Sequence, residues 1–246
     1  MRRCPAPPFA ALLAALLPLI FLWAARPATA LTIAKGVPFY ARDMEYYYQE
    51  KRAETLPGIL RTFDAQGVLA DSRKQLTLAA FLAEVLRRDP TARQRLLPPQ
   101  PGLSRDGRRT LAWTAHLALL PDAATLIHSL LQPEEALLQR QIAESPAPLL
   151  RWNLYAEKTV LQMYWTAYFA SGDTAYLDPI LEAALRYARL NAAGLQKDPN
   201  FPVCAAAAAS LYDLAPRHAA VNARVAQALD RCSGPEAATL RTILRR

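Results

Sequence analysis

Apolar residues recur three and four positions apart through most of this sequence after Gly67, which is the spacing of one face of an α-helix. In residues 76–88 the apolar positions on one side are Leu78, Phe81, Leu82, Val85 and Leu86. Glycine is scarce, with 8 residues in a chain of 246, and runs of β-branched residues are nearly absent. The sequence therefore predicts an all-α protein and argues against a β-sandwich, a β-barrel or a glycine-rich phosphate loop.

Four stretches each combine an alanine-rich helix, a tight turn and a second apolar helix. They are LAAFLAEVLRRDPTARQRLL, LAWTAHLALLPDAATLIHSLL, LQMYWTAYFASGDTAYLDPIL and CAAAAASLYDLAPRHAAVNARV. In the turns, Asp122 and Asp173 stand where an N-cap carboxylate would accept the first helical N–H groups, and Gly172 suits a left-handed helix end. The pattern predicts stacked antiparallel helical hairpins, as in a short irregular α-solenoid. Because the turn-to-turn spacing is not constant, an irregular helix bundle is the alternative.

The third of these stretches has an aromatic helix that runs into a small-Gly-Asp turn, in MYWTAYFASGDTAYLDPIL, and ASLYDLAPRHAAVNARV follows later. These stretches resemble an uncharacterised family of exported bacterial all-α proteins, over about half of the mature chain. The resemblance implies a helical fold and export, and it implies no chemistry.

The first 30 residues have the arrangement of a secretory signal peptide. Arg2 and Arg3 precede an apolar stretch over residues 9–25, and Ala28-Thr29-Ala30 forms a small-x-small cleavage site. We expect cleavage near Ala30, which would leave residues 31–246 as a single all-α helical-hairpin domain in the periplasm or outside the cell. An uncleaved anchor helix is the alternative, although the apolar run is short for a membrane span of about 20 residues.

The net charge of the chain and its expected export together indicate which class of partner the protein binds. The whole chain carries a formal net charge of +8, and the first 30 residues contribute three arginines and no acid, so the mature chain carries 8 − 3 = +5. The basic residues are spread along the chain, with clusters at Arg105-Arg108-Arg109 and Arg241-Arg245-Arg246. Because export separates the protein from nucleic acid, we expect a protein or peptide partner, no nucleic acid and no membrane span after signal removal.

Two cysteines, Cys204 and Cys232, remain after the expected cleavage. An even number of cysteines in an exported chain is typical of a disulfide. Residues 203–214 and 219–231 are expected to form an antiparallel helix pair around the Pro216-Arg217-His218 turn, which would place the cysteines opposite each other. We therefore predict a Cys204–Cys232 disulfide, with two free thiols as the alternative. His218 could hydrogen-bond the end of the preceding helix.

Motifs of catalysis and cofactor binding are absent from the sequence: it has no nucleophile elbow, HExxH zinc helix, P-loop or dinucleotide fingerprint. Glu144-Ser145 is similar to the catalytic pair of lytic transglycosylases, but the other motifs of that family are missing. His116 and His128 are symmetric about Asp122 and could bind zinc only with a third ligand, so two structural histidines are the alternative. We expect no cofactor and no metal site, and we favour a non-catalytic protein over an enzyme.

Two groups of aromatic residues are candidate binding surfaces. Tyr46, Tyr47 and Tyr48 follow Tyr40 and Arg42 in a polar segment, and three consecutive residues of a helix cannot all face one core. Exposed tyrosine and arginine are typical of protein-binding hot spots, so we predict partner contacts here, with core packing as the alternative. The second group has core spacing and consists of Trp152, Tyr155, Tyr164, Trp165, Tyr168 and Phe169.

These features favour an exported, non-catalytic helical scaffold that binds a protein or peptide partner in the cell envelope. The alternative is an envelope glycan-binding protein or a glycan-acting enzyme, in which tyrosines stack on sugar rings. Two carboxylates about 5 to 9 Å apart in a cleft would favour glycoside hydrolysis. Exposed tyrosines without clustered acids would favour binding.

Overall fold

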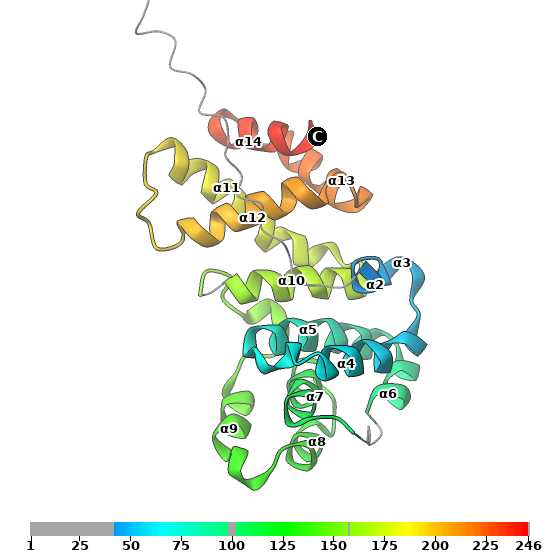
Figure 1. Cartoon of the computed structure of the whole chain (residues 1–246). Helices are drawn as coiled ribbons and strands as arrows, with labels where there is room; N and C mark the ends of the chain where they lie inside the picture. Colours follow the sequence, from blue (N-terminus) through cyan, green and yellow to red (C-terminus); the bar gives the residue numbers. More distant parts are fainter. Residues whose placement is uncertain (1–41, 98–101, 157, 246) are drawn as a thin grey trace, which may run out of the picture. The chain divides into compact units, whose positions relative to one another are not determined.

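The computed structural model describes residues 42–97, 102–156 and 158–245. The expected signal peptide and its cleavage site, together with Tyr40, lie outside these residues. By its internal contacts the chain divides into Met1–Ile33 and Ala34–Arg246, and every described residue belongs to the second unit. The described elements are α-helices and short 3-10 helices, with no strand among them (Figure 1). The predicted all-α fold is confirmed.

The α-helices follow the apolar periodicity closely. In chain order they are α2 (Arg42–Glu45), α3 (Tyr47–Glu50), α4 (Leu56–Ala65), α5 (Ser72–Arg88), α6 (Pro90–Leu96), α7 (Arg105–Leu117), α8 (Ala123–Leu130), α9 (Ala136–Glu144), α10 (Lys158–Ser171), α11 (Leu177–Ala192), α12 (Phe201–Leu214), α13 (Ala219–Leu229) and α14 (Gly234–Leu244). The 3-10 helices are η1 (Ala53–Thr55), η2 (Val68–Ala70), η3 (Pro133–Glu135), η4 (Leu149–Arg151) and η5 (Thr174–Tyr176). Prolines in the first turn begin α4, α6, α12 and α14, where a missing N–H costs nothing.

Helix α5 packs on two neighbours that are distant from each other in the sequence. Its most extensive contact is with α10, and it also packs against α7 (Figure 1). Small residues such as Ala79, Ala80 and Ala83 are buried in α5 and allow this double packing. The aromatic side chains of α10 fill the core beside it, and the fully buried ones are Tyr164, Trp165, Tyr168 and Phe169. Core packing is therefore confirmed for these four members of the second aromatic group.

Only some of the predicted hairpins are packed pairs. Helices α7 and α8 pack together as predicted. Helix α12 instead packs on α11 and α14, and α13 packs on α14 rather than back along α12. After the Arg217-His218 turn, α13 therefore does not run back alongside α12 as it would in an antiparallel hairpin.

The predicted Cys204–Cys232 disulfide is absent from the structure, and this prediction is corrected. Cys204 is a buried free thiol in α12, and Cys232 is a half-buried free thiol between α13 and α14. The prediction required α13 to run back alongside α12. Because α13 packs on α14 instead, symmetry about His218 does not pair the two sulfur atoms.

The turn residues behave as predicted in one hairpin and differently in another. Asp173 caps η5 by accepting the Ala175 N–H at 3.0 Å, and Gly172 has a left-handed φ of 70°. Asp122 makes no side-chain cap for α8, so that prediction is wrong. Its carboxylate instead accepts from the Arg93 guanidinium at 2.6 Å, which competes with the role of an N-cap.

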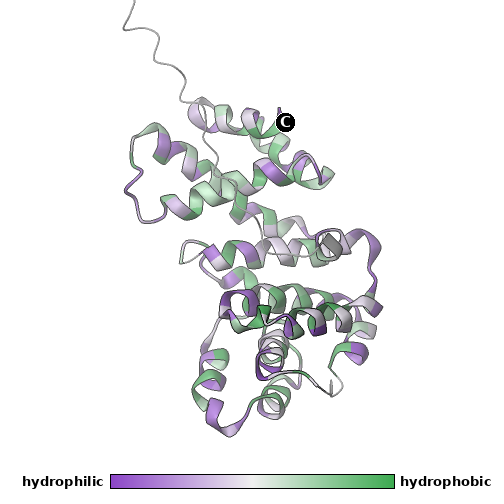
Figure 2. Cartoon of the chain, viewed as in Figure 1, coloured by the Kyte–Doolittle hydropathy of each residue, from purple (hydrophilic) through white to green (hydrophobic). Residues whose placement is uncertain are grey.

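Hydrophobic residues gather along α5 and α12, whereas the connection after α3 and the loop between α11 and α12 are hydrophilic (Figure 2). This distribution agrees with helices that pack on several neighbours and with connections that face solvent. Within the described ranges, every helix is too short or too polar to cross a lipid bilayer.

Candidate binding site where α3, α5 and α10 end

A half-open cavity of about 460 Å³ lies where the C-terminal ends of α3, α5 and α10 meet. Its lining residues are Tyr47, Lys51, Val85, Arg88, Asp89, Ala170 and Ser171. The lining thus combines two cations, one carboxylate and two hydroxyl-bearing side chains with a small apolar part. A cavity of this size can take one or two side chains of a partner or a small ligand.

Lys51 forms one rim of the cavity at the C-cap of α3. Its backbone is left-handed, with φ 48° and ψ 48°, and its N–H donates to the Tyr47 carbonyl at 2.7 Å. A left-handed conformation costs a non-glycine residue about 1 kcal/mol, so the surrounding packing holds this turn. The Lys51 ammonium has no ion-pair partner among the residues that the structure describes, which leaves it available to a ligand.

Arg88 forms the α5 side of the cavity and is held by two carboxylates. Its Nη2 donates to Asp173 at 2.7 Å, and its Nε lies 3.7 Å from Glu84. Glu84 is 2 % exposed and also accepts from Arg87 at 2.6 Å. These contacts fix the Arg88 side chain between α5 and the turn after α10.

Asp89 and Tyr47 complete the polar lining. Asp89 is the N-cap of α6 and accepts from the Thr91 hydroxyl at 2.7 Å and the Thr91 N–H at 2.8 Å. These hydrogen bonds hold the pKa of Asp89 below its usual range, and the bond from the Thr91 hydroxyl has the largest effect. Burial, with Asp89 and Glu54 nearby, raises the pKa of Tyr47 to about 12. At neutral pH the cavity therefore presents a carboxylate and a neutral phenol.

The predicted partner-binding residues are placed mainly in contact with the rest of the fold. Tyr40 lies outside the described residues, and Arg42 is the first residue of α2. Tyr47 is 4 % exposed and packs edge-on against Phe81, so its ring belongs mainly to the core, while a role in partner binding stays a prediction. Tyr46 and Tyr48 are half-buried.

His218 is the residue that Tyr46 and Tyr48 contact, and it is 0 % exposed. The Tyr46 ring stacks on the imidazole at 5.1 Å, and the Phe169 ring stacks on it at 5.4 Å. The Tyr48 hydroxyl lies 3.1 Å from Nδ1 of His218. Nε2 lies 3.0 Å from Oε1 of Glu45, so this histidine bonds a distant segment and not the end of α12 through its side chain.

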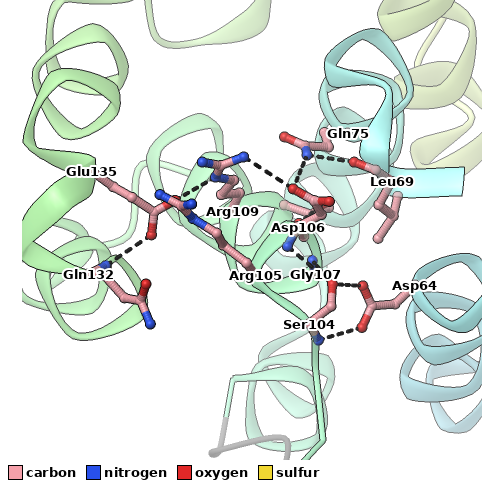
Figure 3. Close-up of polar contacts among 11 residues, drawn as sticks. Asp64, Leu69, Gln75, Ser104, Arg105, Asp106, Gly107, Arg109, Gln132 and Glu135 are labelled. Carbon is pink, nitrogen blue, oxygen red and sulfur yellow. Dashed lines mark hydrogen bonds and ion pairs between the residues drawn. The ribbon is translucent and has the colours of Figure 1, made fainter. Parts of the chain in front are cut away.

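A second polar cluster surrounds the buried carboxylate of Glu135 (Figure 3). Arg105 and Arg109 both donate their Nε–H to Oε1, and the Gln132 N–H donates to Oε2 at 3.0 Å. Burial alone would raise the pKa of Glu135, but the hydrogen bonds from Gln132, Arg109 and Arg105 lower it to about 2. Two arginines of the basic cluster Arg105-Arg108-Arg109 are thus paired with an internal carboxylate.

The same network reaches the start of α7 and the end of α4. The Ser104 hydroxyl accepts the Asp106 N–H at 3.1 Å, which makes Ser104 the N-cap of α7. The Ser104 N–H and hydroxyl both donate to Asp64, the former at 2.7 Å (Figure 3). Because each of these charged groups already has a partner in the chain, the cluster braces α4 and η3 to α7 and offers little to a ligand.

The remaining candidate residues do not form a reactive group. His116 hydrogen-bonds the Ser145 carbonyl at 2.9 Å, and His128 is exposed on α8. The Ser145 hydroxyl donates to the Gln141 carbonyl at 2.7 Å, so it is not paired with Glu144. Among the described residues, no three histidine, cysteine or acidic side chains are grouped as metal ligands would be.

No protein-family model, curated protein or solved structure matches this chain. The resemblance to exported bacterial all-α proteins stays a prediction.

Proposed function

We propose that this protein is an exported, non-catalytic helical scaffold that binds a protein or peptide partner in the cell envelope. The proposed contact is the cavity where α3, α5 and α10 end. The observation that supports the proposal is the lining of this cavity, which offers donors from Lys51 and Arg88 and an acceptor from Asp89. A peptide presents both kinds of group, so it can satisfy both sides of the lining at once.

The electrostatics favour a partner that brings an acidic or carbonyl group to Lys51. Arg88 already contacts Glu84 and Asp173, whereas Lys51 has no ion-pair partner in the described part of the chain. A hydrogen bond to a charged donor is stronger than one between neutral groups, and it is strengthened further in a half-enclosed site. Lys51 is therefore the residue on which binding should depend most.

The glycan alternative receives less support from this site. The described lining contains one carboxylate, Asp89, whereas glycoside hydrolysis uses a pair. Tyr47 is buried against Phe81, so its ring is not a free platform for a sugar. Binding of a peptide or protein remains the function that we propose.

Export is part of the proposal. The arginines at the start, the apolar stretch and Ala28-Thr29-Ala30 predict a mature chain that begins at Leu31. Intact-mass measurement of the protein exported by its own N-terminus tests this point. A mature protein that keeps residues 1–30 would contradict it.

Site-specific photocrosslinking tests the binding site. A photoreactive residue at position 50, which is exposed and next to Lys51, should trap a partner in cells while the Lys51 ammonium is kept. The same residue at position 197 should not, because Lys197 is also exposed but lies far from the cavity in the sequence. The partner, identified by mass spectrometry, is then titrated against purified variants. Lys51→Glu should weaken binding at least about tenfold, and Lys197→Glu should leave it unchanged. Equal binding by the wild type and Lys51→Glu would overturn the proposal.

A further inference from the structure

We infer that Glu45 and His218 form a proton-sensitive latch, which holds α3 in place as one wall of the cavity. The importance of that wall rests on the proposed function. The latch itself rests on the contacts around His218, which are independent of any partner.

The imidazole of His218 is enclosed by aromatic rings and by the side chain of Glu45. Tyr46 and Phe169 stack on the ring, and the edge of Tyr168 approaches with its centroid at 6.1 Å. Glu45 is 4 % exposed, so both members of the pair are removed from water. The two residues are 173 positions apart, and their contact attaches the segment of α2 and α3 to the turn before α13.

The hydrogen bonds of His218 determine which ring nitrogen carries the proton while the latch is closed. The Glu45 carboxylate also accepts from Arg217, at 2.7 Å to Oε1, so it acts as an acceptor and His218 Nε2 must donate to it. In a neutral ring Nδ1 then accepts from the Tyr48 hydroxyl. The Tyr48 oxygen in turn accepts from the Gln49 amide at 2.7 Å. Every polar atom of the neutral imidazole is therefore satisfied.

Protonation of His218 disturbs this arrangement in two ways. Nδ1 would change from acceptor to donor, and the Tyr48 hydroxyl would lose the acceptor of its own proton. The charge balance would also change. The titratable and charged groups that face the ring are Glu45, Tyr46 and Tyr48 from the N-terminal segment, Tyr168 from α10 and Arg217 from the turn.

While the ring is neutral, the Glu45 carboxylate is already offset by Arg217, whose side chain is 41 % exposed. A second proton on the imidazole would therefore add a charged group that is fully removed from water. Burial lowers the pKa of His218, and the opposing effect of Glu45 does not fully compensate. Acid therefore favours the open arrangement, in which the ring is hydrated.

The latch is directly continuous with the cavity. Glu45 and Tyr48 make the latch contacts, while Tyr47 and Lys51 of the same short segment line the cavity. Release of Glu45 and Tyr48 would free α3, and the cavity would lose the wall that carries Lys51. A partner that binds the formed cavity should bind at neutral pH and be released in acid.

Hydrogen exchange of the partner-free mature protein tests the latch. After correction for intrinsic rates, amides of residues 42–51 should lose protection by up to about tenfold between about pH 7.5 and about pH 5.5, while α7 should keep its protection. His218→Gln, whose amide can still donate to Glu45, should abolish the pH response. His116→Gln should retain it, because His116 hydrogen-bonds a backbone carbonyl elsewhere.

Two outcomes would overturn the latch: protection of residues 42–51 that is independent of pH in the wild type, or an unchanged response in His218→Gln. If His218→Gln does not fold, an NMR titration of the wild-type His218 ring replaces it, and a pKa at or above that of a free histidine would overturn the latch. Failure of the proposed function is recognised separately, by partner binding that ignores Lys51→Glu.

Discussion

The guanidinium of Arg88 donates to the carboxylate of Asp173 at 2.7 Å, across 85 positions of sequence. Arg88 ends α5, and Asp173 follows α10, so one ion pair joins the C-terminal ends of the two central helices. Both side chains are partly exposed, and such a pair alone contributes at most about 1 kcal/mol. The ion pair matters because it holds the Arg88 side chain, which forms one wall of the cavity, in place.

Removal of the Glu135 carboxylate should destabilise the fold substantially. Glu135→Ala would leave Arg105 and Arg109 without their shared acceptor, and we expect a loss of about 2 kcal/mol in the free energy of unfolding. Glu134→Ala is the control, because Glu134 is the exposed neighbour and its loss should cost less than about 0.5 kcal/mol. Urea denaturation of both variants gives the comparison, and equal losses would contradict the structure.

The contribution of Glu135 should also depend on pH. Its pKa falls from an ordinary 4.5 to about 2 in the folded chain, so the native state holds this proton less tightly than the unfolded chain. The stabilisation is therefore complete above pH 4.5 and is lost as the pH falls through 2. The difference in unfolding free energy between the wild type and Glu135→Gln should be constant at neutral pH and shrink in acid. If the difference in unfolding free energy between the two proteins grew in acid, it would contradict the lowered pKa of Glu135.

Gly172→Ala should cost more than an ordinary left-handed glycine replacement. The φ of Gly172 is 70°, and an added Cβ would lie 3.1 Å from Cδ2 of Tyr48. Gly194 is a matched control, with a φ of 72° and no neighbouring atom within 4 Å. We expect Gly194→Ala to lose about 1 kcal/mol and Gly172→Ala to lose roughly 1 kcal/mol more. Thermal unfolding distinguishes the two, and indistinguishable midpoints would argue against the Tyr48 contact.

Gly107→Ala should destabilise the protein even though Gly107 lies inside a helix. An added Cβ would lie 2.9 Å from the Asp64 carboxylate, which Ser104 holds in place. Gly58→Ala in α4 has free space and should instead stabilise the protein by about 0.5 to 1 kcal/mol. We expect opposite signs for the two variants in denaturant unfolding. A stabilising Gly107→Ala would show that the Asp64–Ser104 contact is weak.

The two cysteines of the described chain should both react as thiols. Alkylation of the denatured, non-reduced protein should modify Cys204 and Cys232 completely. In the native protein Cys232 should react first, because Cys204 is buried whereas Cys232 is half-buried, and burial raises the pKa of both thiols. Peptide mapping reports both positions, and a crosslinked Cys204–Cys232 peptide would contradict the structure.

Helix positions could be predicted because their signals are local. Residues 76–88 were sufficient to identify α5 from apolar spacing, although the helix begins earlier, at Ser72. The start was missed because Asp71 caps it by accepting the Arg73 N–H, and an aspartate before a polar first turn is a weak signal. The start of α7 has a similarly weak signal, since its cap is Ser104 in a proline- and glycine-rich stretch.

The direction of the chain after each helix could not be predicted in the same way. A short turn such as Arg217-His218 permits several angles between its helices, and burial of α13 against α14 decides among them. The disulfide prediction depended on one of these angles and was wrong for that reason. Long-range packing of α5 on α10 likewise has no local signal.

The cavity residues were not recognised because each has an ordinary local role. Lys51 and Arg88 are cations at helix ends, where they suit the helix dipole, and Asp89 is an N-cap. Only the meeting of three helix ends makes them neighbours. Tyr47 is the one cavity residue among the predicted partner contacts, and its ring packs mainly against Phe81.

The contacts of the three consecutive tyrosines impose an order on folding. Tyr46, Tyr47 and Tyr48 meet His218, Phe81 and Tyr168, which belong to three separate parts of the chain. A chain synthesised from its N-terminus presents Glu45 long before His218, which follows 173 positions later. The contact of this segment with Phe81 can form early, but its contacts with His218 must wait until nearly the whole chain has been synthesised.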